Sequence, residues 1–266
     1  MVEDRRRRAL SDTQVRGSSV GVVLRFTAPL LLVGVLYFVA MYGMRQPRME
    51  SVTTPEPLLI GYATEQLSAD PSSDHWRSVE PVTIRLFPQA VRAAFGSEVR
   101  VVLVRGAYNV GEMAFLLELE ESTEGSGASH APDGCAVMLT PGAPPATAQM
   151  MGHGGNANIW HWVSDTAAGA SDASPSTDQG VRELIATGPG TQAPMAFQRV
   201  EGRGEYARGR WSVVIKRQRE SLQAGELEVA PAAALSVAVA VWDGARGEGL
   251  SAKSISILRP LRLVRD

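Results

Sequence analysis

The chain has 266 residues and a formal net charge of −2, so no overall basic field points to nucleic acid as a partner. Hydrophobic residues make up 44% of the sequence and charged residues 20%, which is typical of a globular protein with a sizeable core. The single cysteine, Cys135, excludes an intramolecular disulfide, a cysteine-rich zinc site and cysteine-ligated iron–sulfur clusters.

An apolar stretch near the amino terminus is long enough to cross a membrane as a helix. Residues 26–44 contain no charged side chain, and arginines are concentrated before this stretch. A cleaved signal peptide and a buried core helix are the alternatives, but the stretch is long for the first and has no polar face for the second. We therefore predict a basic cytoplasmic tail over residues 1–20, a single inner-membrane helix over 21–44 and a tether over 45–57. The positive-inside rule then places the domain that follows in the periplasm.

Residues 58–266 have the pattern of an all-β domain. Short runs of alternating or β-branched residues are separated by turns that contain glycine, proline or aspartate, which predicts an antiparallel sandwich or barrel. The predicted strands cover residues 58–62, 82–86, 99–104, 112–119, 136–139, 158–163, 211–217, 235–242 and 254–258. Residues 164–194 are rich in small and polar residues and are predicted to form a long surface loop. Within or near such loops, residues 89–94 and 178–185 are each predicted to form a short turn or helix.

The sequence lacks the common nucleotide-binding and hydrolase motifs. The glycine-rich residues 152–155 have no following Lys-Ser or Lys-Thr pair, and neither a G-x-S-x-G nor an H-E-x-x-H motif is present. Among the four histidines only His153 and His161 are close in sequence, which is weak support for a zinc or copper site. A structural role is the more ordinary interpretation of His161.

Three features predict a cofactor pocket. Met151 ends a loop rich in proline and alanine, and its thioether is a soft, neutral ligand for haem iron. Phe115, Trp160 and Trp162 are suited to line a flat apolar pocket. Lys253 lies between two small residues, and a buried lysine that has lost its proton can coordinate a metal. Each feature alone has an ordinary alternative, since methionine often fills cores and a lysine beside a turn usually faces solvent.

Several short motifs, in one order along the chain, resemble the haem b-binding gamma subunits of the ethylbenzene dehydrogenase, selenate and chlorate reductase and dimethylsulfide dehydrogenase group. These subunits are partners of molybdenum enzymes. The matching segments are residues 81–88, 113–118, 122–123, 132–137, 151–152, 158–162, 211–214, 239–244 and 253–256.

The resemblance implies an immunoglobulin-like β-sandwich that holds one haem b between Met151 and Lys253, with Met150 as a one-residue alternative. Iron held by two protein ligands has no free position for substrate, so such a haem transfers electrons and is not a catalyst. The expected function is that of a membrane-anchored, extracytoplasmic electron-transfer subunit of a larger redox complex, and not an enzyme in its own right. The retained anchor and the turn before Lys253 depart from the family. A haem-free structural or docking subunit on the same sandwich is therefore the alternative.

Overall fold

The computed structural model describes residues 55–89, 100–120, 132–144, 156–164, 180–188, 190–230, 233–246, 248 and 252–265. The chain divides into two units, Met1–Val52 and Thr53–Asp266, and the described residues all belong to the second unit. The predicted membrane helix at 21–44 lies outside the described residues, as do the tail and most of the tether. Within the described ranges, no helix has the length and apolar character needed to cross a membrane.

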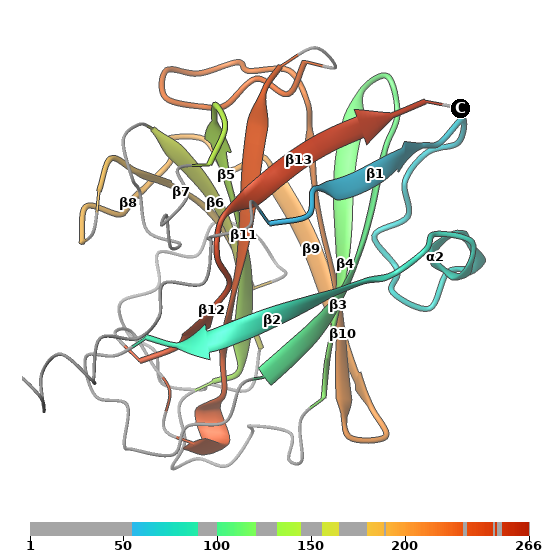
Figure 1. Cartoon of the computed structure of the whole chain (residues 1–266), viewed down its shortest axis with the longest axis vertical. Helices are drawn as coiled ribbons and strands as arrows, with labels where there is room; N and C mark the ends of the chain where they lie inside the picture. Colours follow the sequence, from blue (N-terminus) through green and yellow to red (C-terminus); the bar gives the residue numbers. More distant parts are fainter. Residues whose placement is uncertain are drawn as a thin grey trace, which may run out of the picture. The chain divides into compact units, whose positions relative to one another are not determined.

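Two layers of strands face each other in this domain (Figure 1). The first layer has the order β8-β7-β6-β5-β11, and every neighbouring pair is antiparallel. The second layer has the order β2-β3-β4-β10-β9, again antiparallel throughout. The bounds of the first layer are β5 (Gly134–Pro141), β6 (Ala157–Val163), β7 (Val181–Ala186), β8 (Ala193–Pro194) and β11 (Leu235–Trp242). Those of the second are β2 (Val82–Pro88), β3 (Arg100–Tyr108), β4 (Glu112–Glu120), β9 (Val200–Ala207) and β10 (Arg210–Gln218).

Three further strands join the two layers along one side. The short β12 (Ser254–Ile255) pairs with β11 of the first layer and with β2 of the second. The last strand, β13 (Arg259–Val264), pairs with β11 and runs parallel to β1 (Leu58–Tyr62), which in turn pairs with β3. The stretch around β12 is therefore fixed by backbone hydrogen bonds to both layers.

The main core fills the space between the layers because inward and outward side chains alternate along each strand. On β6 the inward residues include Trp160 and Trp162, which are both buried. Phe115 on β4 and Trp211 on β10 face them from the second layer. A side chain at Gly204 on β9 would overlap the ring of Trp162, so the glycine makes room for the indole.

The outer face of the second layer is covered by its own short helix. This helix, α2 (Asp74–Arg77), is capped by the Ser73 side chain, and Trp76 from it packs against Leu116 and Val214. The Trp76 indole donates to the carbonyl of Ser68 at 3.2 Å. The outer face of the first layer differs, because it consists largely of alanine and small aliphatic residues.

The predicted all-β antiparallel sandwich is confirmed. The predicted strands coincide with β1 to β6, β10 and β11, although the closing run at 254–258 is hydrogen-bonded as β12 only at its first two residues. The prediction for 178–185 is wrong where the structure describes it, because Val181–Ala186 forms β7. The predicted loop at 164–194 likewise contains β7 and β8. The prediction for 89–94 lies almost wholly outside the described residues.

Candidate functional site

Lys253 is a buried lysine at the junction of the two layers. Its side chain is only 3% exposed. Its backbone carbonyl accepts a hydrogen bond from Gln89 at 2.8 Å, and the amide of Ser256 donates to Val239 at 2.8 Å, so both neighbouring strands hold the lysine in place. Among the described residues its amine has no hydrogen-bond acceptor and no carboxylate partner. Its Nζ lies over the Trp242 ring, 5.2 Å from the ring centre.

The burial of Lys253 changes its chemistry. Removal from water disfavours the charged ammonium, so burial lowers the pKa of the Lys253 amine below its ordinary value. A neutral amine has a free lone pair, which makes it a ligand for a metal ion. A cation–π contact with Trp242 offsets part of the desolvation of the protonated form, but it does not replace a hydrogen-bonded counter-ion.

His161 lies beside Trp242 on the same outer face. The two rings are 4.6 Å apart between centres. Gly134, the register partner of Trp242, lets the two rings pack closely, since a Cβ there would lie 3.0 Å from the Trp162 carbonyl oxygen, 3.6 Å from His161 Nε2 and 3.7 Å from the Trp242 ring. Burial, followed by the positive charges of Arg182 and Lys253, lowers the pKa of His161 to about 4. The imidazole is therefore neutral at neutral pH.

Alanines and larger apolar residues form the rest of this face. Alanines on β5, β6, β7 and β11 are all buried, and they alternate with the inward side chains of the main core. They are Ala136, Ala157, Ala186, Ala238 and Ala240. The larger apolar residues are Met138, Ile159, Ile255 and Leu258, of which Met138 pairs with both Ile159 and Ala238. Around Ala136 and Ala240 the short side chains keep the face close to the backbone, so a flat apolar group can approach the strands closely there. We call this surface, with Lys253, Trp242 and His161, the alanine face.

The predicted site residues do not all lie on the alanine face. Trp160, Trp162 and Phe115 point into the core between the layers, with 5.9 Å between the ring centres of Phe115 and Trp160. Because neighbouring residues of a strand point to opposite sides, His161 faces away from its two tryptophan neighbours. The structure thus separates the three predicted aromatic residues from Lys253. Met151, like Met150, lies outside the described residues, so its distance from Lys253 stays a prediction.

Sequence reasoning missed His161 and Trp242 as members of the site. The alternation of β6 was the available signal, because it places His161 on the face that Trp160 and Trp162 do not occupy. The pairing of β6 with β5 and of β5 with β11, which brings His161 near Trp242, cannot be derived from one strand alone.

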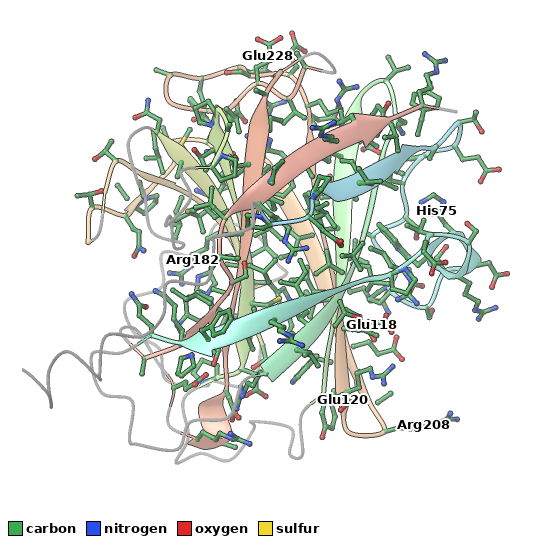
Figure 2. The ribbon with its side chains drawn as sticks, in the orientation of Figure 1. His75, Glu118, Glu120, Arg182, Arg208 and Glu228 are labelled. Carbon is green, nitrogen blue, oxygen red and sulfur yellow. The ribbon has the colours of Figure 1, made fainter. Side chains whose placement is uncertain are left out.

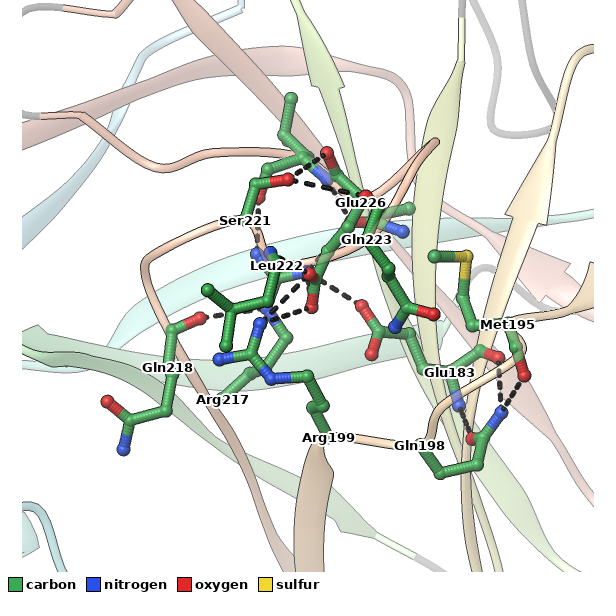
Figure 3. Close-up of polar contacts among 12 residues, drawn as sticks. Glu183, Met195, Gln198, Arg199, Arg217, Gln218, Ser221, Leu222, Gln223 and Glu226 are labelled. Carbon is green, nitrogen blue, oxygen red and sulfur yellow. Dashed lines mark hydrogen bonds and ion pairs between the residues drawn. The ribbon is translucent and has the colours of Figure 1, made fainter.

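A second set of buried charges, shown in Figure 3, lies between the two layers, against the inner side of the first layer. Arg217 on β10 has a fully buried side chain, and its Nη1 contacts Glu183 at 2.7 Å, Asn158 at 2.9 Å and Glu226 at 3.4 Å. Arg199 also contacts Glu226, at 2.9 Å. The guanidinium of Arg217 further lies over the ring of Trp160, 5.3 Å from its centre. We call these residues the Arg217 cluster.

Neither region resembles a site for a hard or borderline metal ion. Across the described ranges, no group of three or more histidine, cysteine, aspartate or glutamate side chains is arranged to hold a metal. Cys135, the single cysteine, is buried in the main core, and burial raises the pKa of its thiol far above the ordinary value. The unpaired amine of Lys253 is thus the described group best suited to bind a metal within a larger apolar cofactor.

The fold and the alanine face together define a β-sandwich in which Lys253 is buried and its amine has no carboxylate partner within the described residues. No family model matches the chain. A protein of Haloferax mediterranei, provisionally named a respiratory nitrate reductase heme subunit, is 28% identical over 201 residues, which is 72% of this chain and 67% of that protein.

Solved structures share the fold at very low sequence identity. A family 9 carbohydrate-binding module from Caldicellulosiruptor kristjanssonii, in complex with cellotriose, matches with a TM-score of 0.51 and 8% identity, over 79% of this chain and 95% of the module. A structure of such a module with glucose gives a TM-score of 0.47 and 9% identity over 79% of this chain and 97% of the module. At these identities the likeness concerns the sandwich architecture and says nothing about ligands.

Proposed function

We propose that this protein is a haem-carrying electron-transfer subunit of a larger redox complex, with the haem lying on the alanine face. The observation that carries the proposal is the amine of Lys253, which is 3% exposed and has no acceptor within the described residues. A lysine of this kind costs stability unless something binds it, so a ligand role explains its burial. The heme named for the Haloferax mediterranei relative supports the same cofactor class.

The residues present fit a haem. Lys253 provides a neutral nitrogen ligand, and the buried alanines leave a low apolar surface on which a flat macrocycle can lie. The second axial ligand in the proposal is the thioether of Met151, and the haem is of the b type because the sequence has no pair of cysteines for covalent attachment. When bound, the iron supplies one-electron chemistry. With Lys253 and Met151 both bound to it, the iron would have no position left for a substrate, so the subunit would be a carrier and not the catalyst.

The protein's own residues position and protect the ligand. Backbone hydrogen bonds fix Lys253 to β2, and Trp242 packs against its amine. Burial keeps water from the amine, which favours the unprotonated, ligating form. These features hold the lysine in one geometry.

The setting of the subunit is proposed from the sequence and the relative. Residues 21–44 anchor the chain in the inner membrane with the amino terminus in the cytoplasm, and the β domain lies in the periplasm. The partners are other subunits of a membrane-associated redox complex, of which the relative's name gives nitrate reductase as one example.

The test is a reduced-minus-oxidised absorption spectrum of purified, haem-reconstituted protein. We expect a b-type spectrum in the wild type and its loss or conversion to a five-coordinate form in Lys253→Leu and Met151→Ala. Lys216→Leu is the matched control, because Lys216 is also buried but is paired with Glu112 and Glu201 at 3.3 Å each. Its spectrum should match that of the wild type. A correctly folded wild type that takes up no haem would overturn the proposal and favour the haem-free docking subunit.

A further inference from the structure

Arg182 is an arginine on the alanine face whose charge has no partner in the described part of the chain. It lies on β7, with its side chain half-buried, and neither a hydrogen bond nor an ion pair of its guanidinium is found among the described residues. Its neighbours Val181 and Glu183 point into the main core and the Arg217 cluster, so alternation places Arg182 on the outer face. Figure 2 labels Arg182, far from Arg208 at the β9–β10 turn.

Three other partly buried arginines of the domain have carboxylate partners, whereas Arg219 donates to backbone carbonyls and Arg259 has no ion pair among the described residues. Arg199 contacts Glu226, Arg105 contacts Glu118, and Arg100 contacts Asp243. The guanidinium fork matches a carboxylate in geometry, and partial removal from water strengthens such a pair. Arg182 is therefore suited to an anionic group that does not come from these residues.

The register of the sheet connects Arg182 to the other members of the alanine face. Arg182 pairs with His161, His161 with Ala136, Ala136 with Ala240, and Ala240 with Ile255. Paired residues point to the same side of a sheet, so these five side chains form one row across it. Lys253 precedes Ile255 by two residues, and therefore lies near the far end of the row.

The row has the dimensions and the chemistry of a flat cofactor with an anionic end. Four inter-strand spacings separate β7 from β12, which is about 19 Å between backbones. Two long cationic side chains extend from the ends of this span, and alanines occupy its middle. His161 is close enough to both cations for each to act on its pKa. A flat ring over the alanines would thus have its metal near Lys253 and a peripheral carboxylate near Arg182.

We propose that Arg182 and His161 form a carboxylate subsite, in which the guanidinium of Arg182 pairs with a propionate of the haem whose iron is bound by Lys253. This inference rests on the proposed function and adds the orientation of the bound group. His161, a neutral imidazole that packs against Trp242 beside Gly134, donates its N–H to the same carboxylate. Arg182 and His161 are positioning residues, because neither contacts the iron.

The experiment compares two ligands that differ at their propionate groups, which are charged in one and esterified in the other. The full-length apoprotein is titrated with iron protoporphyrin IX and with its dimethyl ester, and binding is followed by absorbance. In the wild type, we expect the free acid to bind about tenfold or more tightly than the ester, since a charge-assisted hydrogen bond is lost with the ester. Arg182→Gln should weaken binding of the free acid by about the same factor and leave that of the ester unchanged.

Control variants separate this subsite from general effects. Arg208→Gln removes an exposed arginine from the β9–β10 turn and should change neither affinity. Lys253→Leu should alter the spectrum of both complexes, whereas Arg182→Gln should leave the spectrum of the saturated complex unchanged.

Two outcomes distinguish the failure of this inference from the failure of the proposed function. Equal affinity of the wild type for both porphyrins, or an equal loss of both in Arg182→Gln, would overturn the carboxylate subsite while haem binding itself stands. A folded wild type that binds neither porphyrin would overturn both proposals.

Discussion

Two buried cations, one on the inner side of the first layer and one on its outer side, have contrasting surroundings. Arg217, on the inner side, contacts Glu183, Asn158 and Glu226 and lies over an indole. The amine of Lys253, on the outer side, lies over the Trp242 ring and has no hydrogen-bond acceptor among the described residues. Both side chains are almost fully removed from water.

This difference distinguishes a buried charge with a structural role from one that is available to a ligand. A buried ion is tolerated when hydrogen-bonded partners replace its lost water, and the Arg217 cluster provides these partners from β6, β7 and the segment after β10. Lys253 has no such compensation from the described chain, so its burial disfavours the apoprotein. Binding of a metal by the neutral amine removes this cost.

The largest expected effect is on Arg217. The substitution Arg217→Met should lower the free energy of unfolding by about 3–5 kcal/mol, because it leaves Glu183 and Glu226 as buried carboxylates without their shared cation. Urea denaturation followed by tryptophan fluorescence measures this change. The exposed Arg208→Met should alter stability by less than about 0.5 kcal/mol. A loss below about 1 kcal/mol for Arg217→Met would remove the contrast between the two cations.

The next effect tests how tightly the inner side is packed. Gly204→Ala should destabilise the domain by about 1–3 kcal/mol, because the new methyl group overlaps the ring of Trp162. Gly61→Ala is the control on another strand, since a Cβ there meets nothing within 4 Å. Thermal unfolding of both variants measures the difference. If Gly204→Ala matched Gly61→Ala, the core around Trp162 would be looser than the structure indicates.

The packing between the two layers also explains which strands could be predicted from the sequence. Strands such as β3, β6 and β11 alternate or are rich in β-branched residues, so their presence follows from local pattern. β7 was missed because its inward residue Glu183 is acidic, which breaks the apolar alternation. Its burial depends on Arg217, which comes from β10, 34 residues away in the chain. β9 was missed because Gly202 and Gly204 resemble turn residues, whereas they make room for side chains of the opposite layer.

The candidate site could be predicted only in part, because it too depends on contacts between distant strands. Lys253 was identified from its small neighbours and the family pattern. The role of the two tryptophans of β6 depends on which face of the strand is outward, and that is decided by sheet packing. The register that brings His161, Gly134 and Trp242 together involves three strands, so no single stretch of sequence contains it.

A smaller effect sharpens the comparison from the outer side. Lys253→Met should leave the stability of the apoprotein unchanged or raise it by about 1 kcal/mol, because it removes a buried amine that lacks a hydrogen-bonded partner. Lys216→Met, which breaks the pairs with Glu112 and Glu201, should lower stability instead. Chemical denaturation of the haem-free proteins measures both. A clear loss of stability in Lys253→Met would mean that the amine has a structural role in the apoprotein.

The smallest effect concerns the pH dependence of the Arg217 cluster. Burial raises the pKa of Glu183 above its ordinary value, with the nearby Glu226 acting in the same direction and Arg217 opposing it. The folded state therefore holds the proton more tightly than the unfolded state does. The resulting stabilisation is fully present below the unfolded pKa and is lost as the pH rises through the folded pKa.

Glu183→Gln removes this dependence because the amide does not titrate. The stability of the wild type relative to this variant should fall as the pH rises from about 4 toward neutrality, by at most about 1.4 kcal/mol per pH unit, and then remain level. Urea denaturation of both proteins over this range measures the difference. A relative stability that rose with pH instead would show that Arg217 outweighs the burial of Glu183 and the repulsion from Glu226. In that case the cluster would have enough positive charge for both carboxylates, and its contrast with the unpaired Lys253 would be larger than burial alone indicates.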